Sequence, residues 1–154
     1  MEDKTKQYAL KLLSYRGRSE SEMIERLSRK GASDQSIAST IQYLRDAGLL
    51  NDFSLAEALK REALATRMLS QAGARTFILK RGIPKNIVDS VFAGDENTDL
   101  ENAVRLSEKK LKALAMYPVL TARRRLYQLL LRRGYSVGTI MKVMKDKYMK
   151  EDER

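Results

Sequence analysis

The stretch Met23-Ile24-Glu25-Arg26-Leu27-Ser28-Arg29-Lys30-Gly31 returns twice further along the chain in altered form. Residues 74–82 and 126–134 align with it without gaps, so the three glycines are separated by 51 and then 52 positions. In each copy, apolar residues stand four positions before the glycine and six and ten positions after it. These nine residues are Leu27, Ile37 and Ile41, then Ile78, Val88 and Phe92, then Leu130, Ile140 and Met144. The shared register predicts two amphipathic helices in each copy, joined at the glycine.

The three glycines, Gly31, Gly82 and Gly134, each follow the last residue of a predicted helix. A residue at that position commonly takes a left-handed conformation, which glycine adopts without steric cost. Each repeat therefore consists of an entering helix, a middle helix that ends at the glycine corner, and a third helix.

Helical spacing continues through the rest of the chain, while strand and hairpin signals are almost absent. We expect nine helices, at residues 4–16, 20–30, 34–47, 52–68, 71–81, 84–92, 98–115, 119–132 and 137–147. The predicted fold is all-α, with three tandem three-helix repeats at residues 1–50, 51–97 and 98–154. Because neighbouring repeats share side chains in such arrays, an elongated and curved arrangement is expected.

Several helix starts carry capping signals. Ser19 with Glu22 fits a capping box, and so does Thr98 with Glu101. Ser33 and Ser136 stand at expected N-cap positions. Pro84 fits the first helical position, where the missing N–H costs nothing.

The composition excludes several kinds of chemistry. The chain has 154 residues with neither Cys nor His, so thiol and imidazole catalysis and Cys or His metal ligation are ruled out. The acids Asp95, Glu96, Asp99 and Glu101 are close in sequence, but they surround a helix start, where the helix dipole favours them. We therefore expect no enzyme activity, no metal, no cofactor and no small-molecule substrate.

The net charge of +10 favours a polyanionic partner such as a nucleic acid, a nucleoprotein or an acidic protein face. No apolar run is long enough to span a membrane, and the first residues lack the apolar stretch of a signal peptide. A cytoplasmic protein that makes no membrane contact is the expectation.

The positive charge is concentrated in the third repeat, where residues 98–154 hold 14 basic and 7 acidic side chains. Its candidate contact residues are Arg123, Arg124, Arg125, Arg132, Arg133 and Lys142. Arg125 and Arg132 are seven positions apart and share a helix face, with Leu126, Leu130 and Leu131 expected on the core-facing side. Few acids lie nearby, so the strip is suited either to phosphate or to acidic side chains of a partner.

A pair of basic residues precedes each corner glycine: Arg29-Lys30, Lys80-Arg81 and Arg132-Arg133. Such cations favour a helix C-terminus through the dipole, and they also fit a binding role. The sequence leaves both interpretations open. Four tyrosines are interleaved with the cations of the third repeat, and each suits either base stacking or core packing: Tyr117, Tyr127, Tyr135 and Tyr148.

Further residues carry a family resemblance. The run Tyr8-Ala9-Leu10-Lys11-Leu12-Leu13, followed by Arg18-Ser19-Glu20-Ser21-Glu22-Met23, resembles the opening pattern of the RecX family of bacterial RecA regulators. The segment Leu44-Arg45-Asp46-Ala47-Gly48-Leu49-Leu50-Asn51-Asp52 is similar to a junction of that family, with Asn51 replacing an acid. The resemblance extends from about Tyr8 to Met144. The segment from Gly73 to Leu79 corresponds to a family stretch that usually contains a Pro and a Glu, and this chain has neither there.

The resemblance implies a regulator without enzymatic activity that binds RecA and its filament on single-stranded DNA. Family members lie in the groove of the filament and restrain strand exchange, ATP hydrolysis and RecA-stimulated cleavage of the SOS repressor. A weak direct DNA contact fits this picture as an addition. The alternative is a helix-turn-helix protein that binds duplex DNA directly, with residues 26–40 as the motif. The threefold recurrence of the corner and the lack of a clearly polar recognition helix favour the first interpretation.

Overall fold

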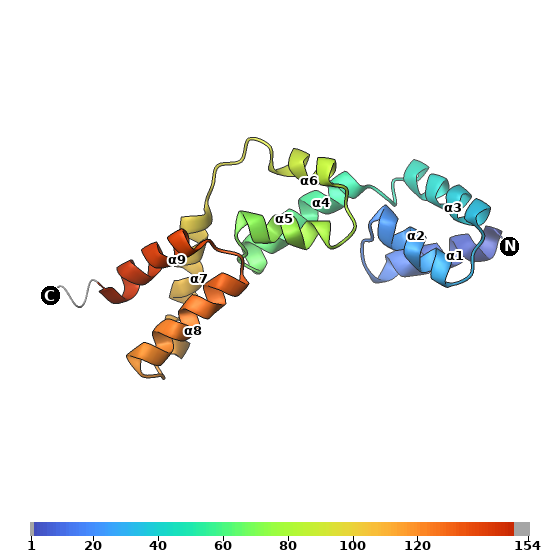
Figure 1. Ribbon diagram of the computed structural model, residues 1–154. Coiled ribbons are helices and arrows are strands. Elements are labelled where there is room, and N and C mark those ends of the chain that lie inside the picture. Colours follow the sequence, from blue (N-terminus) through green and yellow to red (C-terminus); the bar gives the residue numbers. More distant parts are fainter. Residues whose placement is uncertain (1, 150–154) are drawn as a thin grey trace. The chain divides into compact units, whose positions relative to one another are not determined.

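The computed structural model describes the backbone of residues 2–149 and the side chains of residues 4–148. Every regular element in that range is a helix (Figure 1). The α-helices are α1 (Glu2–Tyr15), α2 (Glu20–Arg29), α3 (Asp34–Asp46), α4 (Asp52–Arg61), α5 (Gln71–Leu79), α6 (Lys85–Phe92), α7 (Asp99–Leu114), α8 (Val119–Arg132) and α9 (Val137–Met144). Two π-helical turns, Glu62–Thr66 and Lys145–Met149, follow directly on α4 and α9. The predicted all-α class is confirmed.

Contacts divide the chain into two compact units. Unit 1 comprises the chain up to Lys60 together with Phe77–Ala93, and unit 2 comprises Arg61–Thr76 together with the chain from Gly94 onward. Each unit takes part of the second sequence repeat. The units therefore reflect which residues contact one another, and their limits differ from those of the sequence repeats. The repeat limits at 50/51 and 97/98 stay a prediction.

In unit 1, α1, α2 and α3 pack against one another around a small core (Figure 1). The core residues come from all three helices and from the start of the following segment: Ala9, Leu12, Met23, Leu27, Ile37, Ile41, Leu44 and Leu50. Each helix buries one stripe, as expected for helices that cannot stand alone in water.

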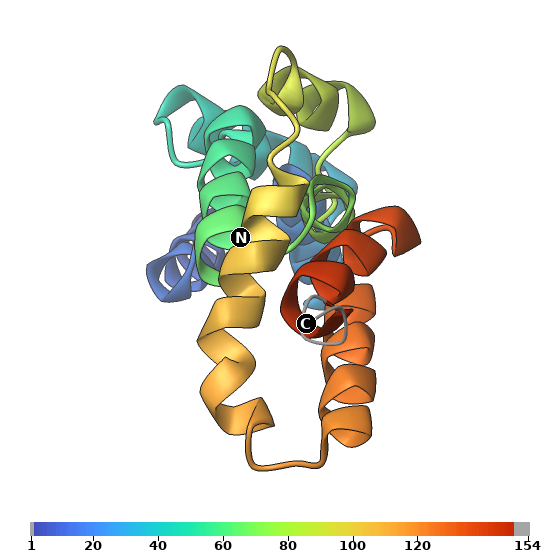
Figure 2. The same ribbon diagram turned by 90° about the vertical axis from the view of Figure 1, so that its left-hand side faces the viewer.

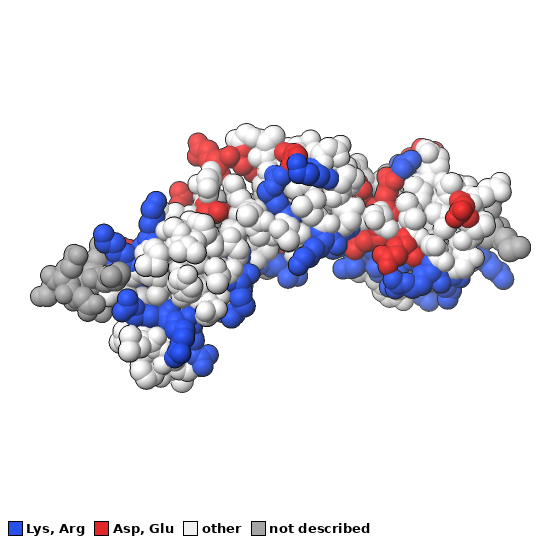
Figure 3. Space-filling view, in the orientation of Figure 1, with Lys and Arg blue, Asp and Glu red and all other residues white. Residues whose placement is uncertain are grey.

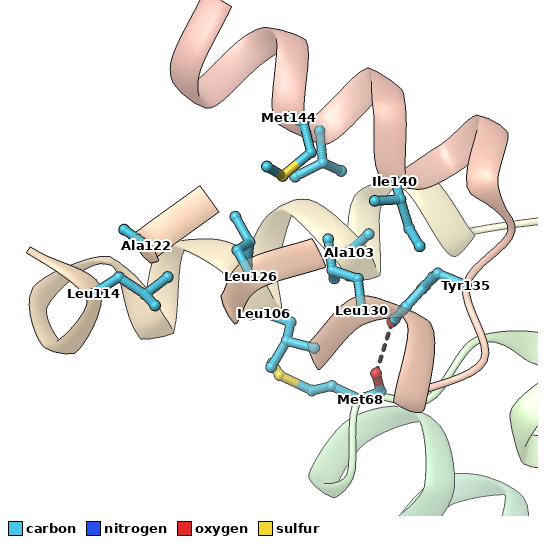
Figure 4. Packing of buried hydrophobic residues seen from close by; sticks show 11 residues of the cluster. Met68, Ala103, Leu106, Leu114, Ala122, Leu126, Leu130, Tyr135, Ile140 and Met144 are labelled. Carbon is cyan, nitrogen blue, oxygen red and sulfur yellow. Dashed lines mark hydrogen bonds between the residues drawn. The ribbon is translucent and has the colours of Figure 1, made fainter. Parts of the chain in front are cut away.

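In unit 2, α7 and α8 run side by side and α9 packs against both (Figure 2). Their core is the cluster of Figure 4, which also takes in Met68 from the segment before α5. Leu126 and Leu130 of α8 are fully buried there, as predicted. Leu131 is 44% exposed, so its placement on the core-facing side was wrong. It lies one position beyond Leu130, about 100° further around the helix.

The register that defines the repeats is a register of buried residues. All nine apolar positions that recur relative to the corner glycines are buried. The glycines have positive φ angles of 96° at Gly31, 80° at Gly82 and 92° at Gly134. The predicted left-handed corners are therefore confirmed.

Most of the predicted caps are also confirmed. Ser19 and Glu22 form a complete capping box, and Ser33 and Ser136 accept the N–H groups of Ser36 and Thr139. The second capping box was wrong, because the Thr98 side chain caps no backbone N–H of α7. Pro84 precedes α6 as its N-cap residue, one position earlier than expected.

The start of α2 is bound to the second repeat by hydrogen bonds within unit 1. The Ser19 hydroxyl donates to the carbonyl oxygen of Arg81 at 2.5 Å. The Arg81 guanidinium donates to the Gly17 carbonyl at 2.9 Å and to the Glu22 carboxylate at 2.9 Å. The Asp52 carboxylate, at the start of α4, accepts the backbone N–H of Glu20 at 3.0 Å.

The same pattern recurs between the second and third repeats, within unit 2. The Ser70 hydroxyl donates to the Gly134 carbonyl at 2.7 Å, and the Arg133 guanidinium donates to the Arg67 carbonyl. Asp99 accepts the backbone N–H of Gln71 at 2.8 Å. We call each of these two sets of contacts a repeat seam. In both, a serine that begins the middle helix of one repeat is bound to the glycine corner of the next.

The seams predict unequal costs for two similar serine substitutions. Ser19→Ala removes a cap and a part-buried seam bond of a serine that is itself fully buried, and should lower the free energy of unfolding by about 2–3 kcal/mol. Ser33→Ala removes only an exposed cap, and should cost about 1 kcal/mol. Urea unfolding of both variants, followed by circular dichroism, checks this. Equal midpoints would contradict a stabilising role for the seam.

Tyr135 ties the third repeat's corner to the segment before α5. Its hydroxyl donates to the Met68 carbonyl at 2.7 Å (Figure 4). Met68 has a positive φ of 52°, unusual for a residue with a side chain, and its side chain is buried in the unit 2 core. The phenol is thus held in an apolar setting with one fixed acceptor.

This setting predicts a loss of stability at high pH. Burial, with a smaller effect of the Asp99 charge, raises the pKa of Tyr135 from 10.0 to about 12. The unfolded chain therefore ionises first, and the stability that the neutral phenol contributes is present below pH 10 and is lost as the pH rises toward 12. Tyr135→Phe should be less stable than the wild type at neutral pH, and the gap should narrow above pH 10. Urea midpoints across this range test it, and a constant gap would contradict it.

Candidate functional site

The basic strip of the third repeat lies on α8 and α9 in unit 2. The side chains of Arg124, Arg132 and Lys142 are exposed, and none of these three side chains forms a hydrogen bond or ion pair with the described residues. The sequence contains no acid between Lys109 and Asp146. Figure 3 shows Lys and Arg side chains gathered over α8. These cations are therefore available to an anionic partner.

Arg123 and Arg125 are placed differently from their neighbours. The Arg125 guanidinium lies 4.1 Å from the centre of the Tyr117 ring, and that of Arg123 lies 5.9 Å from the centre of the Tyr148 ring. Stacking of this kind contributes about 0.5–1 kcal/mol at exposed sites and keeps the charge in place. Tyr117 thus orients a cation, and Tyr148 does so while it also packs against the core. Tyr127 packs against the same core, one of the two roles foreseen for it, and Tyr135 is buried in it.

The dibasic pairs have different positions in the structure. In the second and third repeats, the residue next to the glycine, Arg81 or Arg133, is partly buried in a repeat seam. The residue before it, Lys80 or Arg132, is exposed. The seam is a structural role that neither interpretation of the pairs included.

Among the described residues, the first repeat's pair contacts side chains of its own repeat. Arg29 forms an ion pair with Glu25 on the same helix, and the Lys30 ammonium lies 5.2 Å from the centre of the Tyr8 ring. No atom lies within 4 Å of the point where a Cβ on Gly31 would stand. This corner is open among the described residues.

The ten candidate residues are therefore not one surface. Four lie in unit 1 and six in unit 2. Those in unit 1 are Arg29, Lys30, Lys80 and Arg81. Those in unit 2 are Arg123, Arg124, Arg125, Arg132, Arg133 and Lys142. The exposed, unpaired cations of α8 and α9 are the part best suited to binding.

Sequence reasoning missed two neighbouring features of unit 2. Lys109, Lys110 and Lys112 are exposed on α7, the helix beside α8. The turn between α7 and α8 and the first residues of α8 present apolar side chains to solvent, with Met116 85% and Leu120 77% exposed. The signal was present in the sequence, since segments around turns are usually polar and residues 116–120 read Met-Tyr-Pro-Val-Leu.

Within the described range, no three acidic side chains are grouped so that they could hold a metal ion. In the same range, no helix has the length and apolar character needed to cross a lipid bilayer. The fold defines a class of protein, namely an all-helical chain built from three-helix repeats. In this chain the third repeat carries a cationic surface.

Comparisons with known proteins identify the family within this class. A sequence model of the first three-helix domain of RecX matches residues 6–44, and one of the third three-helix domain matches residues 97–144. A regulatory protein RecX from Amycolatopsis mediterranei is 30% identical over 144 residues, which cover 93% of this chain and 82% of that protein. The chain belongs to the RecX family of regulatory proteins.

Two further relatives show how far the likeness extends. The regulatory protein RecX of Staphylococcus saprophyticus is 30% identical over 137 residues, and the chain spans about half of its length. The crystal structure of RecX from Lactobacillus salivarius superposes with a TM-score of 0.73 at 25% identity, covering 94% of this chain and 95% of that one.

Proposed function

We propose that this chain binds the RecA recombinase and its filament on single-stranded DNA and restrains strand exchange, ATP hydrolysis and SOS-repressor cleavage. Membership of the RecX family supports a regulatory role, and the family resemblance implies that RecA is the partner. The structural observation that supports this proposal is the set of exposed, unpaired side-chain cations Arg124, Arg132 and Lys142. A nucleoprotein filament offers both phosphates and acidic side chains to such a surface.

The proposed mechanism is binding rather than catalysis. The chain contains no His or Cys, and a regulator that occupies a filament needs only affinity for it. Contacts to the filament would oppose the rearrangements that strand exchange and ATP hydrolysis require, because a ligand stabilises the state to which it binds. Such a partner would place the protein's action in the cytoplasm.

The helix-turn-helix alternative gains no support from the first repeat. The helix in the recognition position would be α3, whose only cation is Arg45. The Arg45 guanidinium is bound to the Glu20 carboxylate, with an Nε to Oε2 distance of 2.8 Å. Base recognition in the major groove commonly uses free Arg, Lys, Asn or Gln side chains. Of the two glutamines of α3, Gln42 donates to Asp46, which leaves Gln35 as the one exposed candidate of these types on the helix. The α3 surface, which carries Asp34 and Asp46, suits a duplex poorly.

A binding competition tests the proposal. Labelled protein is titrated with RecA filaments on single-stranded DNA, with the bare strand and with duplex DNA at the same salt concentration. We expect the filament to bind most tightly and to release the protein as salt rises. Equal affinity for filament and bare strand, or a footprint on one duplex sequence that survives random competitor DNA, would overturn it.

A further inference from the structure

One end of unit 2 presents a group of apolar side chains to solvent. Met116, Val119 and Leu120, at the turn between α7 and α8, are 85%, 64% and 77% exposed (Figure 2). We call these three side chains the apolar tip. Single exposed apolar residues are common on protein surfaces, but a group of them usually marks a contact with another molecule. Because most of each side chain is in contact with water, packing within unit 2 does not account for its apolar character.

The turn that carries the apolar tip is held in a defined shape. The backbone N–H of Tyr117 donates to the Leu114 carbonyl at 3.1 Å. Pro118 follows as the N-cap residue of α8, and its ring restricts the backbone. The Arg125 guanidinium, 4.1 Å from the centre of the Tyr117 ring, links the turn to α8. A surface that is already ordered loses little conformational entropy when a partner binds to it.

Free cations stand close to the apolar tip on both helices. Lys112 is four positions before Met116, in the last turn of α7, and Arg124 is four positions after Leu120, on the same face of α8. Both cationic side chains are exposed, and neither forms a hydrogen bond or ion pair with the described residues. Figure 3 shows Lys and Arg side chains directly beside the uncharged end of α7 and α8. This arrangement fits a partner surface with an apolar recess and negative charge at its edge.

The side chains of the tip favour a protein as the occupant. Unpaired bases stack on aromatic faces, whereas the tip is aliphatic and the neighbouring Tyr117 ring already stacks on Arg125. Segments that insert into a lipid surface usually carry Trp or Phe, and residues 109–125 contain neither. A second copy of this chain would bring the same cations against each other, which costs free energy.

We propose that the apolar tip inserts into an apolar recess, edged by carboxylates, on a protein subunit of the RecA filament. This inference rests on the proposed function and names the kind of partner surface that the third repeat recognises. Met116 and Leu120 supply the apolar contact, and Lys112 and Arg124 pair with the carboxylates at the edge of the recess. The apolar contact adds affinity that is insensitive to salt, whereas the ion pairs add affinity that falls as salt rises.

The test changes Met116 and Leu120 together to Ser, which removes apolar surface and leaves the net charge as it is. Binding of the full-length variant to RecA filaments on single-stranded DNA is measured over a series of salt concentrations, beside the wild type. We expect the variant to bind the filament about 10- to 50-fold more weakly at each salt concentration. Its salt slope and its affinity for bare oligo(dT) should equal those of the wild type.

Leu49→Ser with Leu100→Ser is the matched control, because it also replaces two exposed leucine side chains, 47% and 44% exposed, outside the tip. It should bind the filament as the wild type does. Circular dichroism checks that each variant is folded. If the double variant of the tip is unfolded, Met116→Ser alone takes its place, with an expected loss of affinity of about three- to tenfold.

The outcomes separate this inference from the proposed function. Wild-type affinity of the folded tip variant for the filament, or an equal loss in the control, would overturn the inference alone. A wild-type protein that does not bind the filament would overturn both. An equal loss of affinity for oligo(dT) would assign the tip to bases. Unchanged filament binding with loss of binding to phosphatidylglycerol vesicles would assign it to a lipid surface.

Discussion

Gly134→Ala should lower the free energy of unfolding by about 3 kcal/mol or more, because a methyl group there meets the repeat seam. A Cβ on Gly134 would stand 2.6 Å from the Ser70 hydroxyl and 3.0 Å from the Gly73 Cα. The hydroxyl is held by the Gly134 carbonyl and by the Gly73 N–H, so it cannot turn away without breaking a bond. The positive φ of Gly134 adds backbone strain.

Gly31→Ala is the matched control for this prediction. Gly31 has a similar φ of 96°, but no atom lies within 4 Å of its added Cβ. Backbone strain alone should cost about 1–2 kcal/mol there. Urea unfolding of the two variants separates the steric cost of the seam from the conformational cost of the corner. Equal destabilisation would mean that the seam contributes nothing to stability.

Reversing the charge of Arg124 and Arg132 together should weaken binding to the RecA filament by about 10- to 100-fold at low salt. Both side chains are exposed and unpaired among the described residues, so their replacement by Glu disturbs no contact within the fold. Changing Arg123, Arg124 and Arg125 together to Glu should also weaken inhibition, but two of those residues stack on tyrosines. The double variant therefore separates charge from packing more cleanly.

The control for the double variant is Lys11→Glu with Lys85→Glu, which makes the same change in net charge at exposed positions of unit 1. Binding is measured by filament titration over a series of salt concentrations. The control should bind nearly as the wild type does. If both double variants lost affinity equally, total charge rather than the α8 strip would govern binding.

The periodic features of this fold were predictable because they depend on nearby residues. The corner glycines, the buried register and the Ser19 capping box all follow from spacings of a few positions, which helix geometry fixes. The two wrong predictions concern residues for which these local patterns are ambiguous. Leu131 stands beside a buried position and faces solvent, and Thr98 has the right neighbour at Glu101 but does not cap its helix.

The repeat seams could not be predicted from the sequence, because they join residues that are far apart in it. Arg81 and Glu22 are 59 positions apart, and nothing in their local sequence indicates that they meet. Ser70 and Gly134 are 64 positions apart, so the same difficulty applies to them. Arg125 and Tyr117 are close in sequence, but their stacking depends on the conformation of a turn. For the candidate surface, composition predicted where the cations are, but the tertiary fold decides which of them are free.

Steady-state ATP hydrolysis by RecA on single-stranded DNA, measured as this protein is added, tests the central proposal most directly. A regulator that occupies the filament should lower the rate at amounts well below that of RecA, and the Arg124→Glu and Arg132→Glu double variant should require far more protein for the same effect. An unchanged rate at equimolar wild-type protein would contradict the proposed function.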